Sequence, residues 1–234
     1  MALSGVSGGG EVSRPDTRAP DVKEHMTTLV KICGITNLAD ARYAVEAGAD
    51  FLGFVFAPES KRVVTPATVH EITRQLPAGI RTVGVFVNVT AEQVAEILAF
   101  CKLDLAQLHG EEPPAVATAI GIERVWKTVT LRTPQDVELA LTLPAAAVLA
   151  DTATSGARGG TGLVGDWTLA ARLAGRRSVV LAGGLKPENV AAAIGAVRPF
   201  AVDVSSGVEF APGRKDHDKV RRFIAAVRAV NSQQ

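Results

Sequence analysis

The chain has 234 residues, of which 47% are hydrophobic and 21% charged, and its formal net charge at pH 7 is +1. This near balance argues against the basic surface that binds nucleic acid or an anionic membrane, and no apolar run is long enough to predict a membrane span. Two cysteines, Cys33 and Cys101, and scattered histidines form neither a disulfide framework nor a metal-binding pattern, which favours a reducing cytoplasm and no bound metal.

Residues 1–26 differ in composition from the rest of the chain. Residues 1–10 are rich in Gly, Ser and Ala, and residues 11–25 mix charges and prolines with little apolar content. Sequence of this kind buries too little apolar surface to fold, so we expect a flexible, disordered tail before a single domain at 27–234. The tail lacks the apolar run of a signal peptide, and Met26 is an alternative start.

From residue 28 onward, short β-branched runs alternate with helical patterns. The predicted strands are residues 29–33, 51–56, 82–87, 105–108, 125–130, 147–150, 178–182 and 201–204. The helices predicted after them are residues 38–47, 66–75, 91–100, 114–120, 134–142, 167–173, 187–194 and 216–230. Strands that are apolar on both faces predict a covered parallel sheet, and eight such units predict closure into a (β/α)8 TIM barrel. A doubly wound open sheet is the alternative, disfavoured because no GxGxxG follows the first strand.

Cys33 stands where the first predicted strand leads into a helix that Asn37 is suited to cap. In a parallel barrel this edge carries the active site, and helix N-termini, with Lys31 nearby, would lower the thiol pKa toward a reactive thiolate. The alternative is a buried structural cysteine, because free cysteine is among the most buried residue types. We expect Cys101, at the far end of a predicted helix, to belong to the core.

Other polar residues follow the predicted strands at the same edge of the barrel. Arg62 lies in the loop after the second strand, where its planar fork of donors suits a carboxylate, unless it is only a solvated charge. Asp151 ends the sixth strand before a glycine-containing loop, and it either caps that loop or acts as a proton donor when the loop closes. Gln107 lies at this edge too, and His109 and Asp203 suit hydrogen bonds that shape the loops better than proton transfer.

Two glycine-containing loops follow the last two predicted strands. Gly183-Gly184 comes after the seventh strand and Ser205-Ser206-Gly207 after the eighth. Such loops let backbone amides approach a ligand closely, and in barrels this pair of loops commonly holds a phosphate group. The sequence therefore predicts a phosphate-binding site formed by these two loops.

Six motifs, in this order along residues 28 to about 230, resemble the phosphoribosylanthranilate isomerases of tryptophan biosynthesis. They are Lys31-Ile32-Cys33-Gly34-Ile35-Thr36, Phe54-Val55-Phe56 followed by Ser60-Lys61-Arg62, Gln107-Leu108-His109-Gly110, Ala150-Asp151-Thr152, Leu181-Ala182-Gly183-Gly184-Leu185 and Asp203-Val204-Ser205-Ser206-Gly207-Val208-Glu209. The resemblance implies a barrel that performs the Amadori rearrangement of N-(5′-phosphoribosyl)anthranilate without a cofactor. Ala150, where larger aliphatic residues are common, and the tail are the departures.

Matching position by position, the resemblance makes Cys33 the general base and Asp151 the general acid. It assigns Arg62 to the anthranilate carboxylate. It assigns the phosphate group to Gly183, Gly184, Ser205, Ser206 and Gly207. The expected substrate site is completed by Gln107, His109 and Asp203.

Two alternatives are weighed against this interpretation. A related isomerase of histidine biosynthesis relies on two aspartates, whereas the first strand here ends in Cys33. A non-catalytic sugar-phosphate-binding barrel would not need both Cys33 and Asp151 at the rim. We expect a cytoplasmic enzyme whose partner is a small phosphorylated substrate, with no nucleic acid or membrane partner, and a monomer, with a dimer as the alternative.

Overall fold

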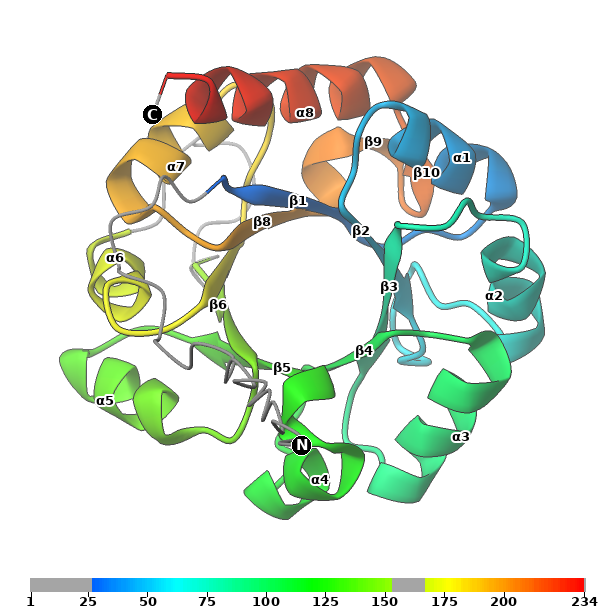
Figure 1. The fold of residues 1–234 in the computed structure, drawn as a ribbon, viewed down its shortest axis with the longest axis horizontal. Helices are drawn as coiled ribbons and strands as arrows, with labels where there is room; N and C mark the ends of the chain where they lie inside the picture. The colour runs from blue at the N-terminus through cyan, green and yellow to red at the C-terminus, as the bar shows by residue number, and fades with distance from the viewer. Residues whose placement is uncertain (1–26, 153–166, 234) are drawn as a thin grey trace, which may run out of the picture.

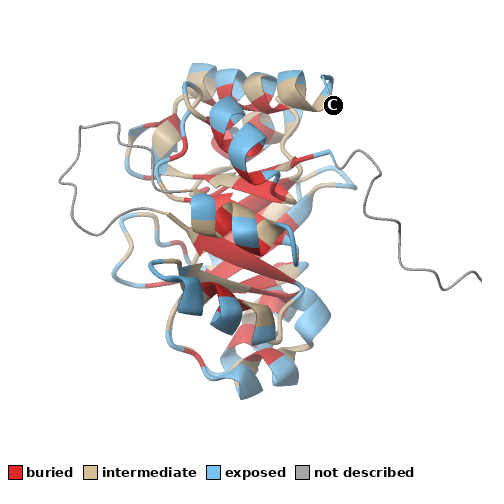
Figure 2. Cartoon of the chain, turned by 90° about the vertical axis from the view of Figure 1, so that its left-hand side faces the viewer, coloured by how far each residue is buried: buried red, intermediate tan, exposed pale blue. Residues whose placement is uncertain are grey.

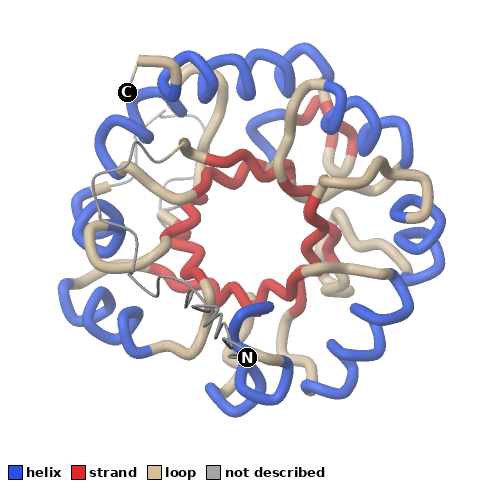
Figure 3. The backbone as a smooth tube through the Cα atoms, in the orientation of Figure 1, coloured by secondary structure: helices blue, strands red, loops and turns tan. Residues whose placement is uncertain are grey.

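The computed structural model describes residues 27–152 and 167–233. Its eight parallel strands form a closed barrel in chain order (Figures 1 and 3). They are β1 (Leu29–Ile32), β2 (Phe51–Val55), β3 (Arg81–Phe86), β4 (Leu105–Leu108), β5 (Val125–Thr130), β6 (Ala147–Asp151), β7 (Val179–Ala182) and β8 (Ala201–Val204). β1 pairs with β8 from Leu29 opposite Ala201 to Ile32 opposite Val204. This closure confirms the predicted TIM barrel and excludes the open sheet.

The helices form a ring outside the barrel (Figure 1). They are α1 (Leu38–Glu46), α2 (Pro66–Thr73), α3 (Ala91–Cys101), α4 (Pro114–Ile120), α5 (Pro134–Thr142), α6 (Thr168–Ala174), α7 (Val190–Val197) and α8 (His217–Asn231), with 3₁₀ turns η1 (Ile122–Arg124) and η2 (Ser206–Val208). Several begin at side-chain caps: Asn37 accepts a hydrogen bond from the Asp40 amide at 2.9 Å, and Thr90 with Gln93 forms a capping box. None of the described helices is long and apolar enough to cross a membrane.

Several elements begin or end one or two residues from their predicted bounds, and two differences from the prediction are larger. α7 begins at Val190 instead of Pro187, because Asn189 accepts a hydrogen bond from the Lys186 amide at 2.8 Å and donates one to the Gly184 carbonyl at 3.0 Å. These bonds stabilise a turn in competition with the helix. An unpredicted antiparallel hairpin of β9 (Glu209–Ala211) and β10 (Arg214–Lys215) stands between η2 and α8.

The apolar core has two parts. The larger part fills the space between the strands and the helices, and the buried residues follow the strands while the exposed ones lie on the outer helix faces (Figure 2). The smaller part closes the inside of the barrel at the strand starts, where Phe51 meets Trp126 edge-on with ring centroids 4.9 Å apart and Phe200 packs against both. With one end filled by aromatic rings, polar side chains are left to the other end. The predicted tail and most of the predicted closing loop lie outside the described residues.

Candidate active site

One cavity of about 440 Å³ opens at the C-terminal ends of the barrel strands. Every site residue predicted from the sequence lines it: Cys33, Arg62, Gln107, His109, Asp151, Gly183, Gly184, Asp203, Ser205, Ser206 and Gly207. Apolar side chains that were not predicted as site residues complete the wall, namely Val55, Ala57, Val85, Val87, Leu149, Ala182, Leu185 and Val204. This combination of an apolar wall and a few convergent polar groups is typical of a small-molecule site.

Cys33 follows β1, and only 7% of it is exposed. The neighbouring strand makes room for its side chain at Gly53, where a Cβ would lie 2.7 Å from Sγ of Cys33 and 3.1 Å from Cε of Lys31. A glycine inside a strand signals such a close approach, so the isolated Gly53 of the second apolar run was an available clue that sequence reasoning passed over.

The pKa of the Cys33 thiol differs from the predicted one. Burial raises the pKa of its thiol above the ordinary value, although the positive charge of Lys31 acts to lower it. The expectation that helix N-termini would lower this pKa was wrong, because a thiolate in the barrel interior loses the water that stabilises it. Lys31 is the nearby cation that offsets part of this loss.

Lys31 is fully buried, two residues before Cys33 on the same face of β1. Its Nζ donates hydrogen bonds to Oε1 of Gln107 at 2.9 Å and to Oδ1 of Asp203 at 3.0 Å. Burial acts to lower the pKa of Lys31, but Asp203 and Cys33 outweigh it, so the pKa is raised and the amine stays charged. Asp203 is the counter-ion of Lys31. A lysine in an otherwise apolar strand was the sequence signal for this buried ion pair.

The Lys31 ammonium also sets the orientation of Gln107 and His109. An ammonium only donates, so the Gln107 oxygen faces Lys31 and its Nε2 faces Nδ1 of His109 at 3.1 Å. Desolvation lowers the pKa of His109 more than Asp151 and Asp203 raise it. His109 is therefore neutral near pH 7, with Nδ1 as acceptor and its proton on Nε2, which makes it a hydrogen-bond donor.

Asp151 is half-buried at the end of β6, opposite Ala182 of β7 in the strand register. The hydroxyl of the next residue, Thr152, donates to the Ala182 carbonyl at 2.9 Å and holds this strand end in place. Asp151 thus reaches the cavity from a different strand than Cys33. The segment predicted to close over it, residues 153–166, lies outside the described residues.

The two loops predicted to hold phosphate meet at one side of the cavity. Gly183 and Gly184 adopt positive φ angles of 93° and 66°, a backbone conformation that glycine reaches without strain. Gly207, at η2, approaches the other loop so closely that a Cβ would lie 1.9 Å from the Leu185 carbonyl oxygen. The hydroxyl of Ser205 is buried and, among the described residues, has no hydrogen-bond partner, so it is available to a ligand.

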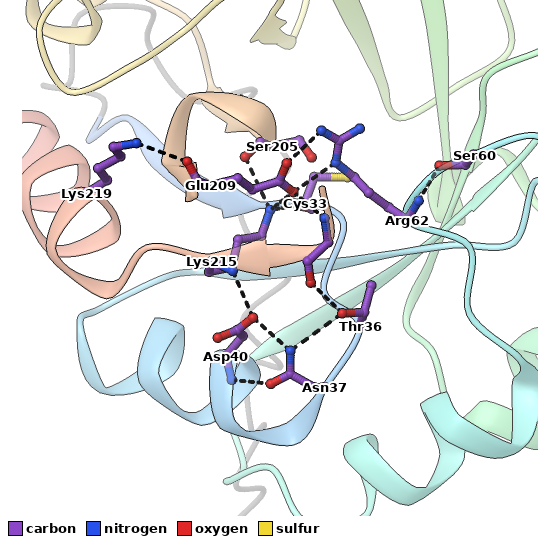
Figure 4. A network of polar contacts seen from close by, with 11 residues as sticks. Cys33, Thr36, Asn37, Asp40, Ser60, Arg62, Ser205, Glu209, Lys215 and Lys219 are labelled. Atoms are coloured by element: carbon purple, nitrogen blue, oxygen red, sulfur yellow. Dashed lines mark hydrogen bonds and ion pairs between the residues drawn. The ribbon is translucent and has the colours of Figure 1, made fainter. Parts of the chain in front are cut away.

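Arg62 lines the cavity but already binds a carboxylate of the protein. Its Nε and Nη2 donate to the two oxygens of Glu209 at 2.8 and 2.7 Å (Figure 4). Glu209 belongs to the hairpin that the sequence did not predict, and it also accepts a hydrogen bond from Nζ of Lys215 at 2.9 Å. The Nε and Nη2 edge of Arg62 is therefore occupied by a carboxylate of the protein itself.

Two further observations concern the second cysteine and metal binding. Cys101 lies in the core at the end of α3, where burial raises its pKa to about 11, so it is far less reactive than a catalytic thiol. Within residues 27–152 and 167–233, no group of three His, Cys, Asp or Glu side chains is placed to hold a metal ion.

Comparison with known proteins gives consistent matches. The family model for N-(5′-phosphoribosyl)anthranilate isomerase matches residues 30–226. A curated isomerase of this name from Magnetococcus marinus is 47% identical over 203 residues, 87% of this chain and 96% of the relative. The one from Thermotoga maritima is 48% identical over 198 residues, 83% of this chain and 96% of the relative.

Solved structures agree with the sequence matches. A crystal structure of phosphoribosylanthranilate isomerase from Thermotoga maritima has a TM-score of 0.80 at 46% identity, covering 86% of this chain and 99% of that one. A second structure of such an isomerase is in complex with reduced 1-(o-carboxyphenylamino)-1-deoxyribulose 5-phosphate. It has a TM-score of 0.78 at 45% identity, with the same coverage.

Proposed function

The chain belongs to the N-(5′-phosphoribosyl)anthranilate isomerase family, and we propose that Cys33 and Asp151 perform the two proton transfers of its reaction. The enzyme converts N-(5′-phosphoribosyl)anthranilate to 1-(2-carboxyphenylamino)-1-deoxyribulose 5-phosphate in tryptophan biosynthesis. The observation that carries the proposal is that a cysteine and an aspartate from different strands share one cavity with two glycine loops and an arginine.

Asp151 acts first in the proposed mechanism, as the general acid. It donates a proton to the furanose ring oxygen while the anilino nitrogen lone pair forms a C1′=N bond and the bond between C1′ and the ring oxygen breaks. The product of this step is an open-chain iminium ion, whose positive charge acidifies the proton on C2′. A carboxyl group at the rim of the barrel is well placed for this donation because it lines the cavity from the end of β6.

Cys33 acts second, as a thiolate that removes the C2′ proton. The electron pair of that C–H bond forms C1′=C2′ and neutralises the iminium, giving an enolamine. Loss of the C2′ hydroxyl proton and gain of a proton at C1′ then yield the ketone, so no atom is gained or lost overall. The charge of Lys31 favours the thiolate within the barrel.

The remaining site residues bind the ends of the substrate. The loops at Gly183-Gly184 and Ser205-Ser206-Gly207 bind the phosphate through backbone amides and the unpartnered Ser205 hydroxyl. Gln107 and Asp203 hold Lys31, and Gln107 also orients His109, whose Nε2 proton is available to a substrate hydroxyl. Binding energy at these distant groups positions the reacting carbons between acid and base.

The test is turnover of N-(5′-phosphoribosyl)anthranilate by two single variants. Cys33→Ser offers a hydroxyl too weakly acidic to serve as base, and Asp151→Asn cannot donate an acidic proton. Each is expected to lower kcat by about 10²- to 10⁴-fold with a modest change in KM, or about 3 to 5 kcal/mol of barrier. Cys101→Ala, at the other cysteine, is the control and should keep kcat. A Cys33→Ser enzyme within threefold of wild type would contradict the assignment of the base.

The domain boundary, the cellular location and the oligomeric state stay predictions. We propose that residues 27–234 form the catalytic domain, and turnover by a chain that starts at Met26 tests this. We also propose that the enzyme is cytoplasmic, and fractionation of its source cells tests that. A monomer is expected, with a dimer as the alternative to be tested by light scattering. One solved neighbour is described as monomers generated from a dimeric phosphoribosylanthranilate isomerase of Thermotoga maritima.

A further inference from the structure

We propose that Glu209 is the positioning residue for Arg62: it binds one edge of the guanidinium group so that the other edge faces the substrate carboxylate. This inference rests on the proposed function and on the assignment of Arg62 to the anthranilate carboxylate, which the sequence resemblance implies. It assigns a role to a buried carboxylate that is not part of the cavity wall and that the reaction itself does not use.

The argument starts from the shape of the guanidinium group. Arginine has two edges that each present a pair of parallel N–H donors, one formed by Nε with one terminal nitrogen and one formed by the two terminal nitrogens. Glu209 takes the Nε and Nη2 edge, with distances of 2.8 and 2.7 Å. Within the part of the chain that the structure describes, no group accepts a hydrogen bond from Nη1 of Arg62. The edge that Nη1 shares with Nη2 can therefore receive a second carboxylate.

Glu209 is itself held in place from several directions. Only 5% of its side chain is exposed, and its Oε1 accepts hydrogen bonds from Nζ of Lys215 at 2.9 Å and from the Gly213 amide at 3.3 Å. Lys219 donates to its backbone carbonyl at 3.0 Å. Burial acts to raise the pKa of Glu209, but the hydrogen bonds from Arg62 and Lys215 lower it overall, so the carboxylate stays ionised.

Lys215 connects this pair to the rest of the site (Figure 4). The same Nζ that binds Glu209 donates to the Cys33 carbonyl at 2.6 Å and to the Ser205 carbonyl at 3.2 Å. The position of Arg62 is thus fixed relative to the strand end that carries the base and to the phosphate loop. A guanidinium held in this way loses little side-chain freedom on binding a ligand, which favours affinity.

Arg62 is the cation of this group that faces the cavity. Glu209 supplies one negative charge between Arg62 and Lys215. Burial lowers the pKa of Lys215, although Glu209 and Cys33 act to raise it, whereas the hydrogen bond with Glu209 raises the pKa of Arg62, so its guanidinium stays charged. The approach of Arg62 also requires Gly34, where a Cβ would lie 2.5 Å from its Cδ.

The experiment compares two substrates that differ only in the carboxylate. Glu209→Gln keeps the size of the side chain but removes its charge, and we expect KM for N-(5′-phosphoribosyl)anthranilate to rise about tenfold while kcat changes less than threefold. For N-(5′-phosphoribosyl)aniline, which has no carboxylate, the variant and wild type should have equal KM. A residue that only holds the fold would change KM for both substrates alike.

The matched control is Glu112→Gln, in a second buried ion pair at the strand ends. Glu112 is 1% exposed in its side chain and pairs with Lys127 at 2.7 Å, but it does not line the cavity. It should lower the unfolding midpoint without changing the ratio of the two KM values. If Glu209→Gln fails to fold, Glu209→Asp, which keeps the charge but shortens the reach, should raise KM selectively for the anthranilate substrate.

The outcomes separate this inference from the proposed function. A KM rise of equal size for both substrates, or no rise for either, overturns the positioning role while leaving the isomerase intact. Failure of the wild-type enzyme to convert N-(5′-phosphoribosyl)anthranilate would instead overturn the function on which the inference rests. A KM rise confined to the carboxylate substrate supports it.

Discussion

Gly53 is the position at which a single methyl group should test whether catalysis depends on the placement of Cys33. A Cβ at Gly53 would lie 2.7 Å from Sγ of Cys33 and 3.1 Å from its Cα. Ordinary van der Waals contact begins at about 3.4 Å, so the sulfur must move by about 0.7 Å or more, and the backbone contact limits how far the strands can separate. The same Cβ would lie 3.1 Å from Cε of Lys31, so the Lys31 side chain must also shift in a Gly53→Ala variant.

The expected cost follows from this displacement. A misplacement of about 1 Å at a reacting group can lower the rate about 10²-fold, so Gly53→Ala should lower kcat by roughly that factor. Overpacking of this kind costs about 1 to 3 kcal/mol of folding stability, which leaves most of the enzyme folded. The loss in kcat, measured at saturating substrate, should therefore exceed any loss of folded protein seen in the unfolding midpoint.

Gly195→Ala on α7 is the matched control for the same substitution. A Cβ there meets nothing within 4 Å, so this variant should keep kcat and gain about 0.5 to 1 kcal/mol of stability from the helix. A second comparison uses Cys33→Ala, in which adding Gly53→Ala should destabilise less because the sulfur is gone. The reasoning is refuted if Gly53→Ala keeps kcat within threefold of wild type, since the sulfur would then have room that the structure does not show.

Two further variants address the base and the phosphate loops. Because burial raises the pKa of Cys33 and Lys31 acts to lower it, Lys31→Met should raise that pKa further. Alkylation of Cys33 by iodoacetamide, followed by peptide mass mapping, should then need a higher pH than in wild type. The double variant Lys31→Met/Asp203→Asn repeats the test without leaving the Asp203 carboxylate unpartnered. An unchanged pH profile of alkylation in the single and the double variant would contradict the role of Lys31. Gly207→Ala places a Cβ 1.9 Å from the Leu185 carbonyl oxygen and should separate the two phosphate loops. We expect KM to rise about tenfold and competitive inhibition by inorganic phosphate to weaken. An unchanged inhibition constant for phosphate would argue against a phosphate site at these loops.

The barrel fold, and the residues that line its cavity, could be predicted from the sequence alone. Alternating apolar runs and helical patterns are local features, and side-chain caps such as Asn37 and Thr90 mark where helices begin. In a parallel barrel every strand ends at the same rim, so residues at successive strand ends must be neighbours however far apart they lie in sequence. Cys33 and Asp151 could be assigned to one cavity for this reason, without any knowledge of side-chain contacts.

Only the tertiary structure decided how the charges of the site are paired. Arg62 binds Glu209 across 147 positions of sequence, and Lys31 binds Asp203 across 172. No local pattern relates such residues, because an ion pair depends on the distance between two charged groups after packing.

The same reason explains the wrong expectation for the Cys33 thiol. Helix ends near a cysteine can be predicted from local sequence, whereas the loss of water around Sγ depends on all the strands that enclose it. The chain order of the strands thus determined which residues meet, and the packed interior determined their charge and their partners.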